Sequence, residues 1–95
     1  MTDRQILRII GANVKTARLK ANLTQECLAE LADVHWQTIS NMENGKFPFP
    51  VTTLARICYA LGTSANRLLD GLPEPDREQI EKTKKAMVRK RKPGS

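Results

Sequence analysis

Four polar and aromatic side chains between residues 36 and 41 are the part of this chain best suited to recognise another molecule. With about 100° between successive helical residues, they share one side of a helix predicted over residues 36–44: Trp36, Gln37, Ser40 and Asn41. Ile39 and Met42 fall on the opposite side and would anchor this helix to a core. A carboxamide can donate and accept hydrogen bonds at one base edge, so this acid-free face suits the major groove of DNA.

The residues just before this helix strengthen that interpretation. Thr24 is a good N-cap for a short helix over residues 25–32, and Asp33-Val34 then forms a tight turn. A short helix, a tight turn and a second short helix make a helix-turn-helix pattern. The alternative is an αα-hairpin within an ordinary helical bundle.

The rest of the chain is predicted to be helical as well. Thr2 and Gln5 fit a capping box that starts a helix ending near Lys20. A loop with two prolines follows residue 46, and a further helix starts at Thr52 or Thr53 and ends before Gly62. Ser64 caps one more short helix. The fold class is therefore all-α.

The charged residues are distributed unequally along the chain. The net charge is +6, but residues 82–92, the basic segment, hold seven of the 16 basic residues and no acid. The remainder has nine basic and ten acidic residues, so the high pI does not by itself indicate a nucleic-acid-binding domain. We expect one domain over residues 1–72 and a basic C-terminal extension over 73–95, in which Glu78–Lys82 and Glu81–Lys85 pairs favour a solvated helix.

Several functional classes find no support in the sequence. It has no apolar run of membrane-spanning length and no signal-peptide pattern. Cys27 and Cys58 lack metal-ligand spacing and are expected to be buried, reduced thiols. We expect no metal or cofactor. The protein is expected in the cytoplasm, associated with the nucleoid. The single histidine, His35, has no catalytic partners at useful spacing, so we do not expect an enzyme.

Over residues 6–71 the chain resembles the phage repressor/Cro-like helix-turn-helix family of XRE-type regulators. The resemblance rests on residues at family spacing: Ile10-Gly11, Val14, Arg18, Leu23-Thr24-Gln25, Leu28-Ala29, Val34, Ile39, Glu43-Asn44-Gly45-Lys46, Leu61-Gly62 and Leu68-Leu69. It implies a five-helix repressor-like domain that binds double-stranded DNA through its second and third helices.

The resemblance also implies roles for individual residues. Trp36, Gln37 and Asn41 match base-contacting positions, with Ser40 beside them. The residues that match or adjoin backbone-contacting positions are Thr24, Gln25, His35, Asn44 and Lys46. Alternatively, Trp36 is a core residue, Gln25 ordinary helix surface and Lys46 a solvated loop lysine. Arg18 and Glu43 match a structural ion pair.

Three positions and one loop depart from the family pattern. Asp33 replaces the usual turn glycine, and aspartate tolerates the left-handed region. His35 replaces a serine or threonine cap, which should weaken that cap and add a phosphate contact. Cys27 replaces a capping-box acid, and Phe47-Pro48-Phe49-Pro50 replaces a polar loop.

We interpret the chain as a sequence-specific transcriptional regulator, a repressor that binds a palindromic operator as a homodimer. The two-fold interface is expected around Leu68, Leu69, Leu72 and Ile80. The alternative is an antitoxin-type protein that holds a protein partner, through its C-terminal extension or its Phe47/Phe49 loop, while repressing its own operon.

Overall fold

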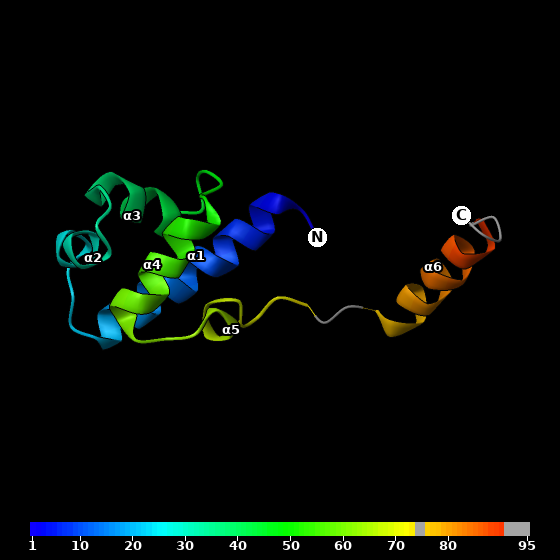
Figure 1. The fold of residues 1–95 in the computed structure, drawn as a ribbon. Helices are drawn as coiled ribbons and strands as arrows, with labels where there is room; N and C mark the ends of the chain where they lie inside the picture. The colour runs from blue at the N-terminus through cyan, green and yellow to red at the C-terminus, as the bar shows by residue number, and fades with distance from the viewer. Residues whose placement is uncertain (74–75, 91–95) are drawn as a thin grey trace.

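The computed structural model describes residues 1–73 and 76–90; residues 74–75 and 91–95 of the predicted extension lie outside that range. The described residues form helices and loops, so the all-α prediction is confirmed (Figure 1). The helices are α1 (Asp3–Lys20), α2 (Gln25–Ala32), α3 (Trp36–Glu43), α4 (Val51–Leu61), α5 (Ala65–Leu68) and α6 (Arg77–Lys90). None of these helices has the length and apolar character needed to cross a membrane.

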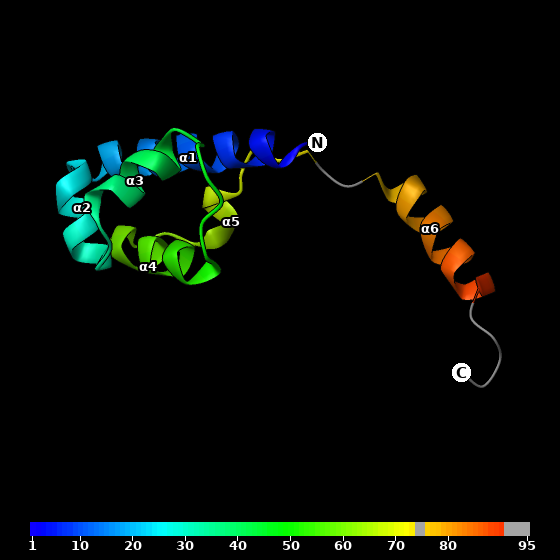
Figure 2. The same cartoon turned by 90° about the horizontal axis from the view of Figure 1, so that it is seen from above.

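Helices α1–α5, here called the bundle, close around one small core (Figure 2). Helix α1 packs against α3 and α5, α2 against α3 and α4, and α4 against α5. The largest fully buried side chains come from all five helices: Val14, Leu28, Ile39, Met42, Ile57 and Leu68. Leu68 is only 1% exposed, so the prediction that it lies at a two-fold interface is wrong. Its side chain is needed to close the core between α4 and α1.

Local sequence signals explain most helix ends. Thr2 and Gln5 form the predicted capping box at the start of α1. Asn22 and Asp33 adopt the left-handed conformation, with φ of 59° and 56°, and Asp33 ends α2 there. Helix α4 begins earlier than predicted, at Val51, because Pro50 itself is the N-cap: its carbonyl accepts the Thr53 N–H at 3.0 Å without any side-chain cap.

A buried ion pair joins three of the helices. Arg18 of α1 donates from Nε to Glu43 Oε2 at 2.7 Å and from Nη2 to Oε1 at 2.9 Å. Its Nη1 donates to the Leu23 carbonyl, and Gln25 Nε2 of α2 donates to Glu43 Oε1 at 3.2 Å. The hydrogen bond with Glu43 raises the pKa of Arg18, although burial opposes that shift. The last residue of α3 is thereby tied to α1 and α2.

A second contact brings α1 and α3 together without side chains. A Cβ atom built on Gly11 would collide with the backbone carbonyls of Met42 and Glu43 at the end of α3. Glycine is therefore required at this crossing, because any side chain would push the two helices apart. At the far side of α1, the Asn13 side chain donates to the Leu68 and Asp70 carbonyls at 2.8 and 2.7 Å, which fixes the end of α5.

The cysteines are only partly as predicted. Both are free thiols, but Cys27 is exposed, so its predicted burial is wrong. It occupies the outer side of α2, whose opposite side carries the buried Ala29 and Ala32. Cys58 is half-buried, and burial raises the pKa of its thiol.

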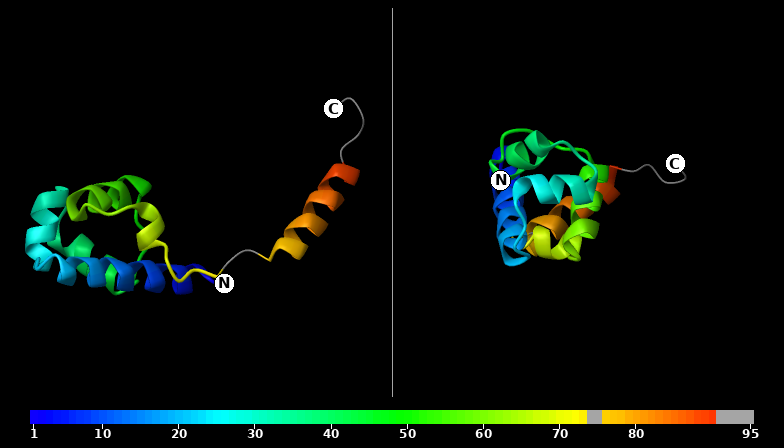
Figure 3. Two further views of the ribbon diagram at one scale, coloured as in Figure 1. Left: turned by 90° about the horizontal axis from the view of Figure 1, so that it is seen from below. Right: turned by 90° about the vertical axis from the view of Figure 1, so that its left-hand side faces the viewer.

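Helix α6 stands apart from the bundle (Figures 1 and 3). Asp76 caps it by accepting the N–H groups of Glu78 and Gln79. The predicted Glu78–Lys82 pair is present at 3.7 Å, whereas Glu81 pairs with Lys84 at 3.7 Å instead of with Lys85. Both spacings, i,i+3 and i,i+4, bring side chains together on a helix surface, so the sequence alone did not distinguish them.

The ion pair generates a stability prediction. Arg18→Met leaves the Glu43 carboxylate buried without its charged partner, which should lower the free energy of unfolding by roughly 3–5 kcal/mol. The double variant Arg18→Met with Glu43→Leu should recover part of this loss, because no isolated charge remains. Urea denaturation followed by circular dichroism measures both; an Arg18→Met variant as stable as the parent would contradict the structural role.

Candidate nucleic-acid interface

The turn between α2 and α3 sets how the two helices meet. Asp33, in the left-handed conformation, reverses the chain after α2, and the Val34 N–H returns to the Ala29 carbonyl at 3.0 Å. Helix α3 then starts at Trp36 with Ile39 and Met42 buried against the bundle. The remaining side of α3 is left on the surface.

That surface, the recognition face, carries the residues predicted to contact bases: Trp36, Gln37, Ser40 and Asn41. The Trp36 side chain is 46% exposed, so the alternative of a core tryptophan is wrong. Gln37 is exposed, and Ser40 and Asn41 are partly exposed. Gln37 Nε2 donates to Asn41 Oδ1 at 3.2 Å, which aligns the two carboxamides one turn apart. Each carboxamide keeps further donor and acceptor positions for a ligand.

His35 caps α3 through its imidazole ring. Its Nδ1 accepts the Gln37 N–H at 3.1 Å, in the place where a serine hydroxyl would accept it, and a weaker cap than serine would give stays a prediction. A neutral imidazole that accepts at Nδ1 carries its proton on Nε2, which leaves Nε2–H as a donor. The ring centroids of His35 and Trp36 are 5.9 Å apart.

The predicted backbone-contacting residues lie around this face. The hydrogen bond from Gln25 to Glu43 places the start of α2 beside the end of α3. Thr24 precedes Gln25 and caps α2 by accepting the Cys27 N–H at 3.1 Å. Asn44 and Lys46, both exposed, follow α3, and the Lys46 N–H bonds to the Asn41 carbonyl. Gln25 is thus more than helix surface, because one of its N–H groups supports the buried ion pair.

The loop after α3 places one exposed aromatic residue beside the predicted backbone contacts. Phe47 is 61% exposed next to Lys46, whereas Phe49 packs against the core. The loop and α3 enclose a hollow of about 230 Å³, lined by Thr38, Asn41, Met42 and residues 47–50.

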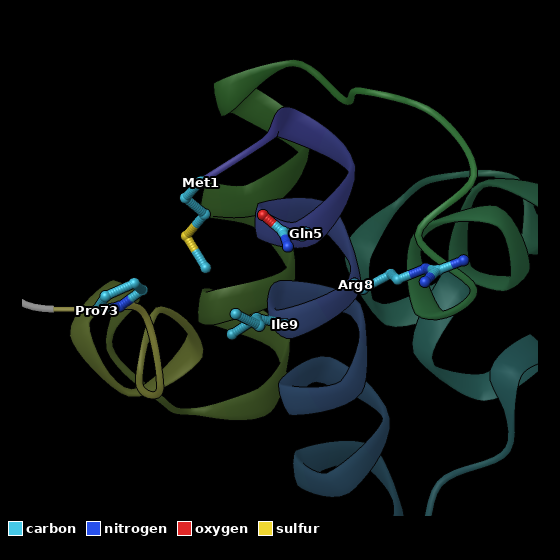
Figure 4. A pocket seen from close by; sticks show the side chains of 5 residues that line it. All are labelled: Met1, Gln5, Arg8, Ile9 and Pro73. Carbon is cyan, nitrogen blue, oxygen red and sulfur yellow. The ribbon is translucent and has the colours of Figure 1, made fainter.

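Another hollow, of about 480 Å³, lies away from the recognition face where α1 begins. Its lining residues are Met1, Gln5, Arg8, Ile9 and Pro73. Figure 4 shows Met1 and Ile9 facing Pro73, while Arg8 points to the other side of α1. This lining contains no histidine, cysteine or carboxylate. Within the described parts of the chain, no cluster of three such residues could hold a metal ion.

Comparison with known proteins identifies a matching family and a related protein. The helix-turn-helix family HTH_3 matches residues 14–68. The control protein C.SmaI from Serratia marcescens is 36% identical over 64 residues, which cover 67% of this chain and 76% of that protein.

Two solved structures have a similar fold. The clp gene regulator ClgR from C. glutamicum is 30% identical, with a TM-score of 0.65 over 67% of this chain and 82% of that one. The restriction-modification controller protein C.AhdI from Aeromonas hydrophila, at 22% identity, has the same fold, with a TM-score of 0.64 over 65% of this chain and 94% of its own.

The His35 cap gives a second prediction. His35→Ala removes the acceptor for the Gln37 N–H and should destabilise the protein by about 0.5–2 kcal/mol. His35→Ser, which restores a hydroxyl cap, should be at least as stable as the parent. Urea denaturation of the parent and the two variants measures their free energies of unfolding. Equal stability of the alanine variant and the parent would show that the cap contributes nothing.

Proposed function

The chain belongs to the HTH_3 helix-turn-helix family of DNA-binding transcription regulators, and on this premise we propose that it reads a palindromic operator as a homodimeric repressor. The observation that carries the proposal is the recognition face of α3, which is exposed while Ile39 and Met42 hold the helix to the core. Because the control protein C.SmaI is 36% identical over 64 residues, we further propose that this chain is a regulator of the controller-protein kind.

Base reading falls to the carboxamides of Gln37 and Asn41. Each can accept from adenine N6 and donate to adenine N7 in the major groove. Their mutual hydrogen bond holds them on one side of α3, so little side-chain entropy is lost when both engage one half-site. Trp36 offers an apolar contact for a thymine methyl group, and Ser40 lies between these residues on the same face.

Phosphate contacts hold α3 in the groove. Donors surround the recognition face at both of its ends: the hydroxyl of Thr24, the carboxamides of Gln25 and Asn44, Nε2–H of His35 and the ammonium group of Lys46. Such contacts set the register of a protein on DNA without reading sequence. The start of α2 adds its free N–H groups.

Dimerisation follows from the small reach of one helix. One α3 reads only a few base pairs, and two copies about 34 Å apart read a palindrome. Leu68 is buried, Leu69 and Leu72 are only partly exposed, and Ile80 lies on α6, so these four residues offer little continuous apolar surface. Helix α4 carries an exposed apolar stripe at four-residue spacing, with Val51 78% and Tyr59 93% exposed and Ala55 between them. We assign the two-fold contact to this stripe.

Substitution of the carboxamides tests base reading. Gln37→Ala or Asn41→Ala should cost about 1–3 kcal/mol on the preferred site and relax preference at one position per half-site. The preferred site comes from selection of bound duplexes out of a random pool, followed by binding to single-base variants. Lys46→Ala is the matched control and should weaken all sequences nearly equally, because phosphate contacts carry no base information. An unchanged preference profile for both alanine variants would exclude α3 as the reading element.

The dimer prediction uses α4. Tyr59→Glu places a charge on the apolar stripe and should shift the protein towards monomer, because a charge buried at an interface loses its hydration. Lys15→Glu, on the exposed side of α1, is the control and should leave the oligomeric state unchanged. Light scattering over a concentration series reports both; a parent chain that is monomeric at high concentration and on operator DNA contradicts the proposal.

A further inference from the structure

The positive charge of this protein is concentrated outside the bundle. No acidic residue follows Glu81, whereas residues 82–92 hold seven lysines and arginines. Residues 1–72, which include the bundle, carry eight basic and six acidic groups, a net charge of +2, whereas residues 73–95 carry eight basic and four acidic groups, a net charge of +4. A bundle with so little net charge has a weak general attraction for a polyanion, so long-range attraction to DNA must come mainly from the basic segment.

The lysines of α6 are available to a ligand. Residues 76–88 are all exposed, and the two ion pairs of α6 have N–O distances of 3.7 Å between side chains that are at least 65% exposed. Exposed pairs of this kind contribute little stability. Lys82 and Lys84 can therefore exchange their carboxylate partners for phosphates at small cost.

The two sides of α6 differ. On a helical wheel Lys82 and Lys85 lie opposite Ile80 and Met87, whereas Lys84 lies beside these two apolar residues and lines a hollow on α6 with them. The apolar side is narrow, and α6 has a single carboxamide, Gln79, for reading bases. With 14 residues α6 is about 21 Å long, which corresponds to about six phosphates of one DNA strand along the duplex axis.

We propose that α6 is a second, sequence-independent DNA contact, in which Lys82, Lys84 and Lys85 bind the phosphate backbone beside the base pairs read by α3. The inference rests on the proposed function, since it assigns a role to the chain's extension on the same DNA. Charge complementarity favours DNA over a protein partner, because a protein docked on the narrow apolar side would contact Lys84 and leave Lys82 and Lys85 without a partner. In this arrangement α3 supplies sequence preference and α6 supplies affinity common to all sequences.

The test compares two triple variants of the full chain. Lys82→Gln/Lys84→Gln/Lys85→Gln removes three charges from α6, and Lys15→Gln/Lys20→Gln/Arg67→Gln removes three exposed charges from the bundle. Fluorescence anisotropy measures binding to the selected operator with long flanks, to a scrambled duplex of equal length and to a duplex trimmed to the operator, from about 50 to 200 mM salt.

We expect the α6 variant to lose the same factor of affinity on both long duplexes, and its log–log salt slope to fall by up to about 2.7, or about 0.9 for each of three contacts. The bundle variant should keep the parent slope. On the trimmed duplex the α6 variant should bind like the parent. Circular dichroism confirms that both variants are folded.

Three results would overturn the inference: an unchanged slope in the α6 variant, an equal fall in both variants, or a loss that persists on the trimmed duplex. An unchanged slope would mean that the lysines of α6 do not contact DNA, and a protein would then be the better candidate for their partner. The proposed function fails separately, if the parent itself prefers no duplex over the scrambled one, because the slope comparison needs no sequence preference.

Discussion

The buried pair of Arg18 and Glu43 is the interaction on which the arrangement of this protein depends. Two charges removed from water are costly unless their hydrogen bonds are satisfied. Here the contact is bidentate, and the Leu23 carbonyl and the Gln25 carboxamide complete it. These partners come from α1, α2 and the segment between them, so the end of α3 has one position that satisfies all of them. The close approach at Gly11 reinforces that position.

A fixed α3 makes its outer face a usable surface. The Ile39 and Met42 side chains are buried at one side, the ion pair holds one end and the His35 cap orders the other. Polar groups on such a rigid helix lose little freedom on binding, which is the condition for discrimination between base pairs. The helix is only eight residues long, so this order comes from tertiary contacts and caps more than from helix propensity.

In the arrangement proposed here, specificity and general affinity are served by different parts of the chain. The bundle carries the ordered recognition face but little net charge, whereas the basic segment carries much positive charge and little capacity for base reading. Counterion release depends on the number of phosphates neutralised and not on the order of the bases. A protein with this distribution can vary its overall affinity without altering its sequence preference.

Interactions between residues close in the chain explain what the sequence determined by itself. Caps at Thr2, Thr24 and Ser64, the left-handed turn at Asp33, and the apolar periodicity of α3 depend on neighbouring residues, and each was predicted. The exposed recognition face followed from the same periodicity.

Only the tertiary structure decided which surfaces meet. It buries Leu68 and exposes Cys27, directs Gln25 to Glu43 and makes Gly11 a helix crossing. Each of these outcomes depends on a partner distant in the chain, whose distance and direction are fixed only when the helices pack, and helical periodicity carries no information about that partner.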